Sequence, residues 1–209
     1  ASTLALEIDA GRDPATMAKA IGQHGLNAAG ASLYDQIAPE LKERLVKVLG
    51  RAGIGEGAVA GFRPWLVVMM LSLAEYGAQG YRPDLAVDMH LSQLARGKGV
   101  PVVELESVDG QLSLFSSMPQ AEQLRFLEEV VAMIEQGKQA ADVRQVVDAW
   151  SRADKAGLDA IARRIEQDKT LSGRFLQKVL LEERNVNMAE KLAQLVAQKN
   201  NSVAAVGVL

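Results

Sequence analysis

Apolar residues recur at helical spacing over much of the chain. From Pro39, which fits a first helical turn, to the stop signal at Gly50, four apolar residues share one face: Leu41, Leu45, Val48 and Leu49. The segment of residues 84–97 repeats this pattern, with Asp84 placed to cap the helix and Gly97 and Gly99 placed to end it. We expect the inward face of this second helix to consist of Leu85, Met89 and Leu94.

The second half of the chain is predicted to contain a mainly helical subregion, residues 119–198. Its apolar positions keep helical spacing, and breaks are expected near Gly137 and Asp154. The apolar residues expected to face inward include Leu127, Val131, Phe175, Val179, Met188, Leu192 and Leu195.

Three runs are too short, too alternating or too β-branched to favour a helix: "STLALEID" at residues 2–9, "VPVVELE" at 100–106 and "SVAAVGVL" at 202–209. A helix followed by a short apolar strand is half of a βαβ unit. We therefore predict an α/β fold with a small, mainly parallel sheet and a large helical portion, in a single domain over residues 1–209. Because two of the strands lie at the ends of the chain, where polar tails are usual, we also expect a chain cut at both ends.

Composition narrows the possible partners. The chain has 209 residues, 48% of them apolar, which suits one globular domain with a substantial core. Its net charge of −3 comes from scattered residues without a basic stripe, so nucleic acid is not an expected partner.

The longest apolar run, from Trp65 to Leu71, is far shorter than the roughly 20 residues that cross a bilayer, so no membrane span is expected. The absence of cysteine excludes disulfides and thiolate metal sites.

Two glutamates, Glu7 and Glu106, follow predicted strands. Ligand sites in α/β sheets gather outside the carboxyl ends of the strands, where these two carboxylates would converge. Such a pair can hold a hard or borderline cation, or take the proton from a metal-bound water. The alternative is that each glutamate only marks where its strand meets water, and spacing alone favours that alternative. We assign Glu104 a structural role.

Several segments in their order along the chain resemble the TraB/GumN family, which is related to the Tiki proteases. They are "LALEID", "FRPWLVVMML", "AVDMHLSQLARGKGVPVVELESVDGQ", "AWSRAD", "LLEERNVNMAEKLAQLV" and "VAAVG". The most specific pieces are Leu105 and Glu106 with Gln111, and an "ERN..MA" pattern that begins at Glu183. The resemblance spans nearly the whole chain.

This resemblance implies a metal-dependent hydrolase, with a peptidase as one form of it. Family members carry two strand-end Gly-x-x-His motifs. The first motif would lie upstream of this chain. The second motif would begin at Gly207, and the chain ends just before the position of its histidine. The resemblance thus implies that the full-length protein binds a divalent metal ion, and that Glu7 and Glu106 complete the metal site. It also implies that this fragment is itself inactive and holds no tightly bound cofactor. The sequence does not identify the substrate, which could be a peptide or a small molecule.

The alternative implied by the same family is a non-catalytic binding or regulatory module, linked to polysaccharide export or conjugation control. An intact Gly-x-x-His motif at both ends of the full-length gene would favour the enzyme. Relatives with signal peptides suggest a location in the periplasm or at the cell surface.

Arg184 and Asn185 are the remaining candidate catalytic residues, beside Glu7 and Glu106. Consecutive residues of a helix point about 100° apart, so the residues of "ERN" cannot all face one site. Arg184 can offer its planar guanidinium to a carboxylate or an oxyanion, with Asn185 orienting it. It can equally pair with a glutamate to hold the sheet to the helix. Both interpretations place Arg184 near the two glutamates.

The histidines and tryptophans are assigned no role in chemistry. His24 is expected in a Gly-rich loop, and His90 does not share a helix face with the acidic residues before it, so neither is expected to bind metal. Trp65 and Trp150 are expected to be core or interface aromatics rather than platforms for a substrate.

Overall fold

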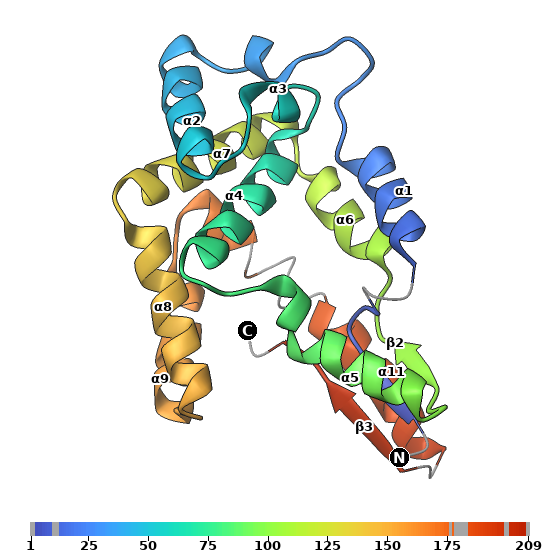
Figure 1. Ribbon diagram of the computed structural model, residues 1–209. Helices are drawn as coiled ribbons and strands as arrows, with labels where there is room; N and C mark the ends of the chain where they lie inside the picture. Colours follow the sequence, from blue (N-terminus) through green and yellow to red (C-terminus); the bar gives the residue numbers. More distant parts are fainter. Residues whose placement is uncertain (1–2, 10–12, 176, 178–183, 199–200, 208–209) are drawn as a thin grey trace.

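The structure, a computed structural model, describes residues 3–9, 13–175, 177, 184–198 and 201–207. At one end of the molecule lies a sheet of three parallel strands in the order β2-β1-β3 (Figure 1). The strands are β1 (Thr3–Leu6), β2 (Val102–Glu104) and β3 (Ser202–Ala205). All three lie within the runs predicted to be strands, and the predicted α/β fold with a small parallel sheet is confirmed.

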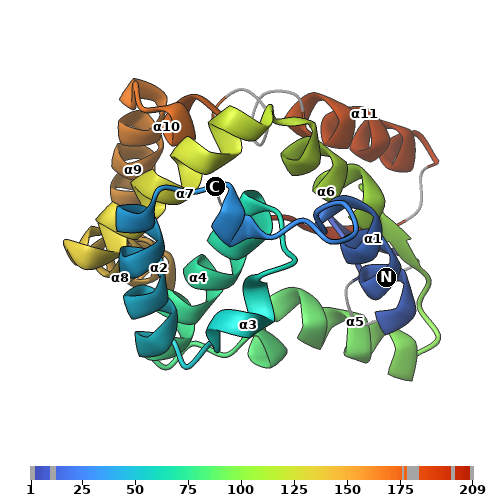
Figure 2. The same ribbon diagram turned by 90° about the horizontal axis from the view of Figure 1, so that it is seen from above.

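Helices cover both faces of the central strand, because successive side chains of a strand point to opposite faces. Leu4 and Leu6 pack against Ala95 of α5 (Val87–Gly97), while Ala5 packs with Met188 of α11 (Arg184–Ala197). Figure 2 shows these two helices on opposite sides of the sheet.

The large helical portion lies at the other end of the molecule (Figure 1). Its core joins α2 (Pro39–Arg51), α4 (Pro64–Ala78) and α7 (Gln120–Glu135) through buried side chains that include Leu45, Leu49, Val67, Leu71, Leu127 and Val131. The other described helices are α1 (Pro14–His24), α3 (Glu56–Val59), α6 (Val108–Ser117), α8 (Lys138–Ser151), α9 (Lys155–Gln167), α10 (Leu171–Phe175), and the short 3₁₀ helices η1 (Leu33–Asp35) and η2 (Pro83–Leu85). In the described part of the chain, none of the helices has the length and apolarity needed to cross a membrane.

The predicted helix punctuation is confirmed at several points. Helix α2 begins at Pro39, and its four predicted inward residues are all buried. Gly137, with φ of 69°, separates α7 from α8, and Asp154 caps α9 by accepting a hydrogen bond from Gly157 N at 2.9 Å. The single domain over residues 1–209, with a mainly helical subregion at 119–198, stays a prediction, and Val179 lies outside the described residues.

The expected inward face of α5 is wrong. The helix begins at Val87, after Ala86 in extended conformation, while Asp84 lies in η2 and pairs with Arg82. Leu85 and Leu94 are 69% and 46% exposed, and Ser92 and Ala95 are buried instead. Packing against the sheet selects this face, where Ala95 contacts Leu4 and Leu6 and Leu91 packs beside them.

Candidate functional site

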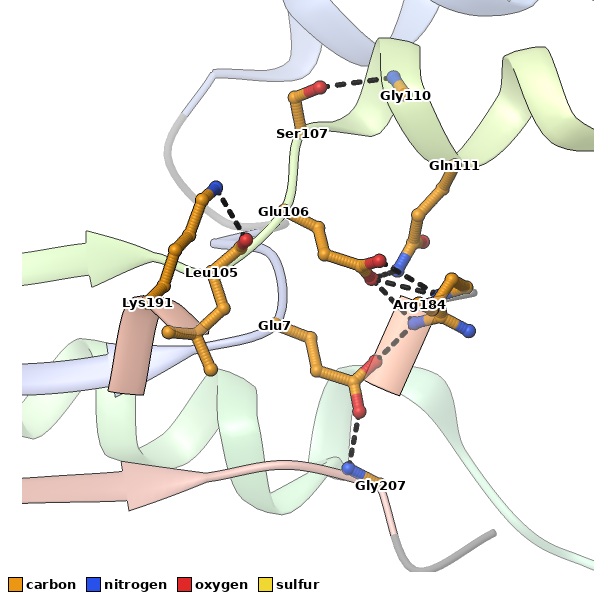
Figure 3. Close-up of polar contacts among 9 residues, drawn as sticks. All are labelled: Glu7, Leu105, Glu106, Ser107, Gly110, Gln111, Arg184, Lys191 and Gly207. Carbon is orange, nitrogen blue, oxygen red and sulfur yellow. Dashed lines mark hydrogen bonds and ion pairs between the residues drawn. The ribbon is translucent and has the colours of Figure 1, made fainter. Parts of the chain in front are cut away.

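Glu7 and Glu106 lie side by side at the carboxyl edge of the sheet (Figure 3). Pairing between the chain segments continues past the strands, because Leu105 N donates to Leu6 O at 2.8 Å and Glu106 N donates to Glu7 O at 2.9 Å. Glu7 directly follows β1 and Glu106 lies two residues beyond β2. The parallel arrangement therefore brings together two carboxylates that are far apart in the sequence.

The guanidinium of Arg184 lies between these two carboxylates (Figure 3). Its Nη2 donates to Glu7 Oε2 at 2.8 Å and to Glu106 Oε2 at 2.6 Å, and its Nε is 3.0 Å from both oxygens of Glu106. Since one nitrogen contacts both carboxylates, they lie well within the about 10 Å over which one ion or water can be shared. The expected convergence of these three residues is observed.

Two further donors complete the cluster. Gln111 Nε2 donates to Glu106 Oε2 at 2.6 Å, and Gly207 N donates to Glu7 Oε1 at 2.5 Å. Each of the four carboxylate oxygens thus accepts at least one hydrogen bond. Such bonds stabilise the charged form of a carboxylate that is removed from water.

Helix packing fixes the donors in place. Arg184 is the first residue of α11, which is held on the sheet by Met188 and by Lys191, whose Nζ donates to Leu105 O at 2.6 Å. Gln111 stands in the first turns of α6, where Ser107 caps the helix by accepting from Gly110 N at 3.0 Å. The cluster is therefore built on the ends of regular elements.

The electrostatics of the cluster favour ionised groups. Burial raises the pKa of the Glu106 carboxyl, but hydrogen bonds from Arg184 and Gln111, with the charges of Arg184 and Lys191, outweigh that effect and hold the pKa below its ordinary value of 4.5. The hydrogen bond to Glu106 raises the pKa of Arg184 more than burial lowers it, and the charges of both glutamates add to the rise. At neutral pH Glu106 is therefore negatively charged and Arg184 positively charged, in direct contact.

Two clefts of about 520 Å³ each open on either side of the cluster. The cleft beside Glu7 is bounded by side chains of α1, α5 and α8 and by the segment after β3. The cleft beside Glu106 includes Arg184 and Lys191. Gln111 lines both, so the carboxylates stand where the two clefts meet.

The other residues of the predicted site have different surroundings. Asn185 is exposed on α11, and its proposed role in orienting Arg184 stays a prediction; Glu183 lies outside the described residues. Glu104 accepts a hydrogen bond from Asp9 N at 3.0 Å, as suits a structural residue. The sequence singled out Gln111 only as part of the family pattern. Its place five residues after a strand-end glutamate was the available signal.

The expected loop position of His24 needs correction. His24 ends α1 rather than lying in a loop, and its ring contacts Ser116 Oγ at 3.1 Å and Asp109 Oδ1 at 2.9 Å. Ser116 Oγ also donates to Ser113 O, so these contacts join α1 to α6. Trp65 is fully buried as expected. Trp150 is half exposed and lines the cleft beside Glu7, so it is not a core residue, and its place at an interface stays a prediction. Because Trp150 is far from the strands in the sequence, its position in the cleft beside Glu7 could not be predicted.

The described residues meet only part of the requirement for a catalytic metal. Glu7 and Glu106 are oxygen donors of a suitable kind, but in the described part of the chain no three histidine, cysteine, aspartate or glutamate side chains gather into a metal-binding group. Arg184 already supplies a cation to both carboxylates. Any complete metal site therefore needs donors from other residues.

The fold is α/β, with paired carboxylates and an arginine at the carboxyl edge of a parallel sheet. Residues 1–209 match the TraB/PrgY/gumN family, and the chain belongs to that family. This confirms the resemblance drawn from the sequence, while the expectation of a chain cut at both ends stays a prediction.

The chain is also similar to the uncharacterized protein YbaP of Escherichia coli K12 and of Shigella flexneri. Each is 24% identical to it over 181 residues, which cover 85% of this chain and 63% of the relative. The match thus spans less than two thirds of these curated relatives. No solved structure matches the chain significantly.

Proposed function

We propose that the protein carrying this chain is a hydrolase, with peptides among its substrates, and that its active site lies at the junction of the two clefts. The observation that supports this proposal is the convergence of Glu7, Glu106 and Arg184 from three distant segments at one sheet edge. Family membership agrees with it without specifying a reaction.

The residues of this chain have distinct tasks under this proposal. Glu7 borders the cleft and can take a proton from an attacking water, as a positioned carboxylate does in general base catalysis. Arg184 keeps Glu106 ionised, and its Nη1 group, which makes none of the bonds to the glutamates, can donate to an oxyanion. Gln111 holds Glu106 in place.

A divalent metal ion belongs to the same proposal. Glu7 and Glu106 would supply oxygen ligands, and the histidines of the Gly-x-x-His motifs, expected outside this chain, would supply the rest. When bound, such an ion polarises a carbonyl group and lowers the pKa of a bound water. This chain by itself is expected to hold zinc weakly, because two carboxylates without imidazole make an oxygen-only site.

The test combines metal analysis of the full-length protein with a peptidase screen. Glu7→Gln should lower kcat by roughly 10²-fold to 10⁴-fold with a smaller effect on KM, because general base catalysis contributes about that much. The matched control is Glu43→Gln, an exposed glutamate on α2, which should leave the rate unchanged. Equal activity of the two variants would exclude Glu7 from the chemistry.

A second candidate function is the binding or regulatory module. The observation that favours it is that Arg184 satisfies both glutamates at once, as a purely structural ion pair would. Absence of hydrolysis by the metal-loaded full-length protein, combined with intact ligand binding, would support the module over the enzyme.

A further inference from the structure

Large apolar side chains gather, half exposed, around the cleft beside Glu7. Val87 of α5, Trp150 of α8 and Val206 after β3 are 51%, 52% and 50% exposed, and all three line this one cleft. Ile8 and Met17 extend the apolar lining. Apolar side chains left open to solvent around one concavity, rather than scattered singly, are typical of a ligand site.

The charged groups of this cleft are acidic. Among the described residues that line it, the ionisable side chains are Glu7 and Asp88. Of the positive groups nearby, Arg184 and Lys191 line the other cleft, and Arg184 is ion-paired with Glu7 at 2.8 Å. Because Arg184 offsets the charge of Glu7, the negative charge beside the apolar walls is that of Asp88. This combination complements a ligand that has an apolar body and a cationic group.

We infer that the cleft beside Glu7 binds a primary amine attached to an apolar group, such as an apolar residue of a peptide that carries a free amino group. The ring of Trp150 packs against the apolar body and Asp88 attracts the ammonium ion. The inference rests on the proposed function in one respect, the statement that this ligand is part of the substrate. Binding in this cleft would make the proposed hydrolase prefer substrates that carry an amine on an apolar group.

Trp150 itself can report binding through its fluorescence. The other tryptophan, Trp65, is fully buried and stacked on Phe115 with ring centroids 5.4 Å apart, so a ligand in the cleft does not reach it. We would titrate the protein with 2-phenylethylamine and, separately, with 3-phenylpropionate, which has a similar phenylalkyl body and the opposite charge. We expect a saturable change in emission at millimolar amine and a response at least about tenfold weaker to the carboxylate.

Variants test the contacts of Trp150 and Asp88 separately, and calorimetry measures how tightly each variant binds the amine. Trp150→Ala should weaken its binding about tenfold, as loss of an aromatic and cation–π contact does. Leu73→Ala is the matched control, because Leu73 is 54% exposed on α4 and does not line the cleft. Asp88→Asn should reduce the discrimination between amine and carboxylate, whereas Asp84→Asn, at an exposed aspartate outside the cleft, should not.

Equal binding of the two probes, or unchanged amine binding in Trp150→Ala, would overturn the inference. Failure of the inference and failure of the proposed function remain distinguishable. Hydrolysis without preference for amine-bearing apolar substrates, and unaffected by Trp150→Ala, overturns the inference and leaves the hydrolase. Selective amine binding by a protein that hydrolyses nothing supports the assigned ligand class and overturns the hydrolase.

Discussion

Replacing Arg184 by methionine would remove the cation that Glu7 and Glu106 share while leaving a long, unbranched side chain in its place. Among the described residues, Gln111 and Gly207 would then remain as donors to the two carboxylates, which would face each other. We expect a large loss of folding stability, since removing one partner of an ion pair leaves an uncompensated charge.

The magnitude follows from the geometry. Arg184 Nη2 lies 2.8 Å and 2.6 Å from oxygens of Glu7 and Glu106, and the three side chains are 17%, 26% and 12% exposed. A hydrogen bond to a charged group contributes about 1.5–3 kcal/mol, and breaking a fully buried pair costs about 3–5 kcal/mol. Because water can partly replace the lost partner here, we expect a loss of about 2–4 kcal/mol.

The loss should depend on pH. The pKa of Glu106 is lowered in the folded protein, so the stability contributed by its ionised form is present above the ordinary pKa of 4.5 and is lost as pH falls below it. Without Arg184 that contribution is missing at neutral pH too. The difference between wild type and Arg184→Met should therefore be largest near neutral pH and shrink in acid.

Denaturation by urea, followed by circular dichroism at about pH 7 and about pH 4, would measure both effects. The control is Arg164→Met, which removes a more exposed guanidinium 3.0 Å from Asp142 and should cost less than about 1 kcal/mol. A loss below that control, or one that is equal at both pH values, would refute the reasoning.

Three smaller predictions follow from single contacts. Glu106→Gln should flatten the fall of the melting temperature with pH below 4.5, because it removes a carboxyl whose pKa is lowered by folding. Gly137→Ala should cost about 1–2 kcal/mol in urea denaturation, because φ is 69° there, whereas Gly55→Ala, with φ of −67° and open space around it, should be close to neutral. Ser107→Ala should cost about 1 kcal/mol by the same measurement, because it removes the cap of α6.

Local pattern was sufficient to predict most elements of the fold. The apolar stripe of α2, the breaks at Gly137 and Asp154 and the three strands were all visible in the sequence, because helix and strand periods depend on neighbouring residues. The same local reasoning placed Glu7 and Glu106 at strand ends. A general rule on parallel sheets then predicted that their carboxylates meet.

Contacts between distant segments were decided by the tertiary structure. Arg184 and Glu7 are 177 residues apart, and the sequence left open whether Arg184 would contact one glutamate or both. The rotation of α5, which turns Ala95 rather than Leu94 inward, depends on packing against the sheet. Trp150 reaches the cleft only because α8 stands opposite the carboxyl edge. Periodicity indicates which face of an element is apolar, but shape and packing determine what that face meets.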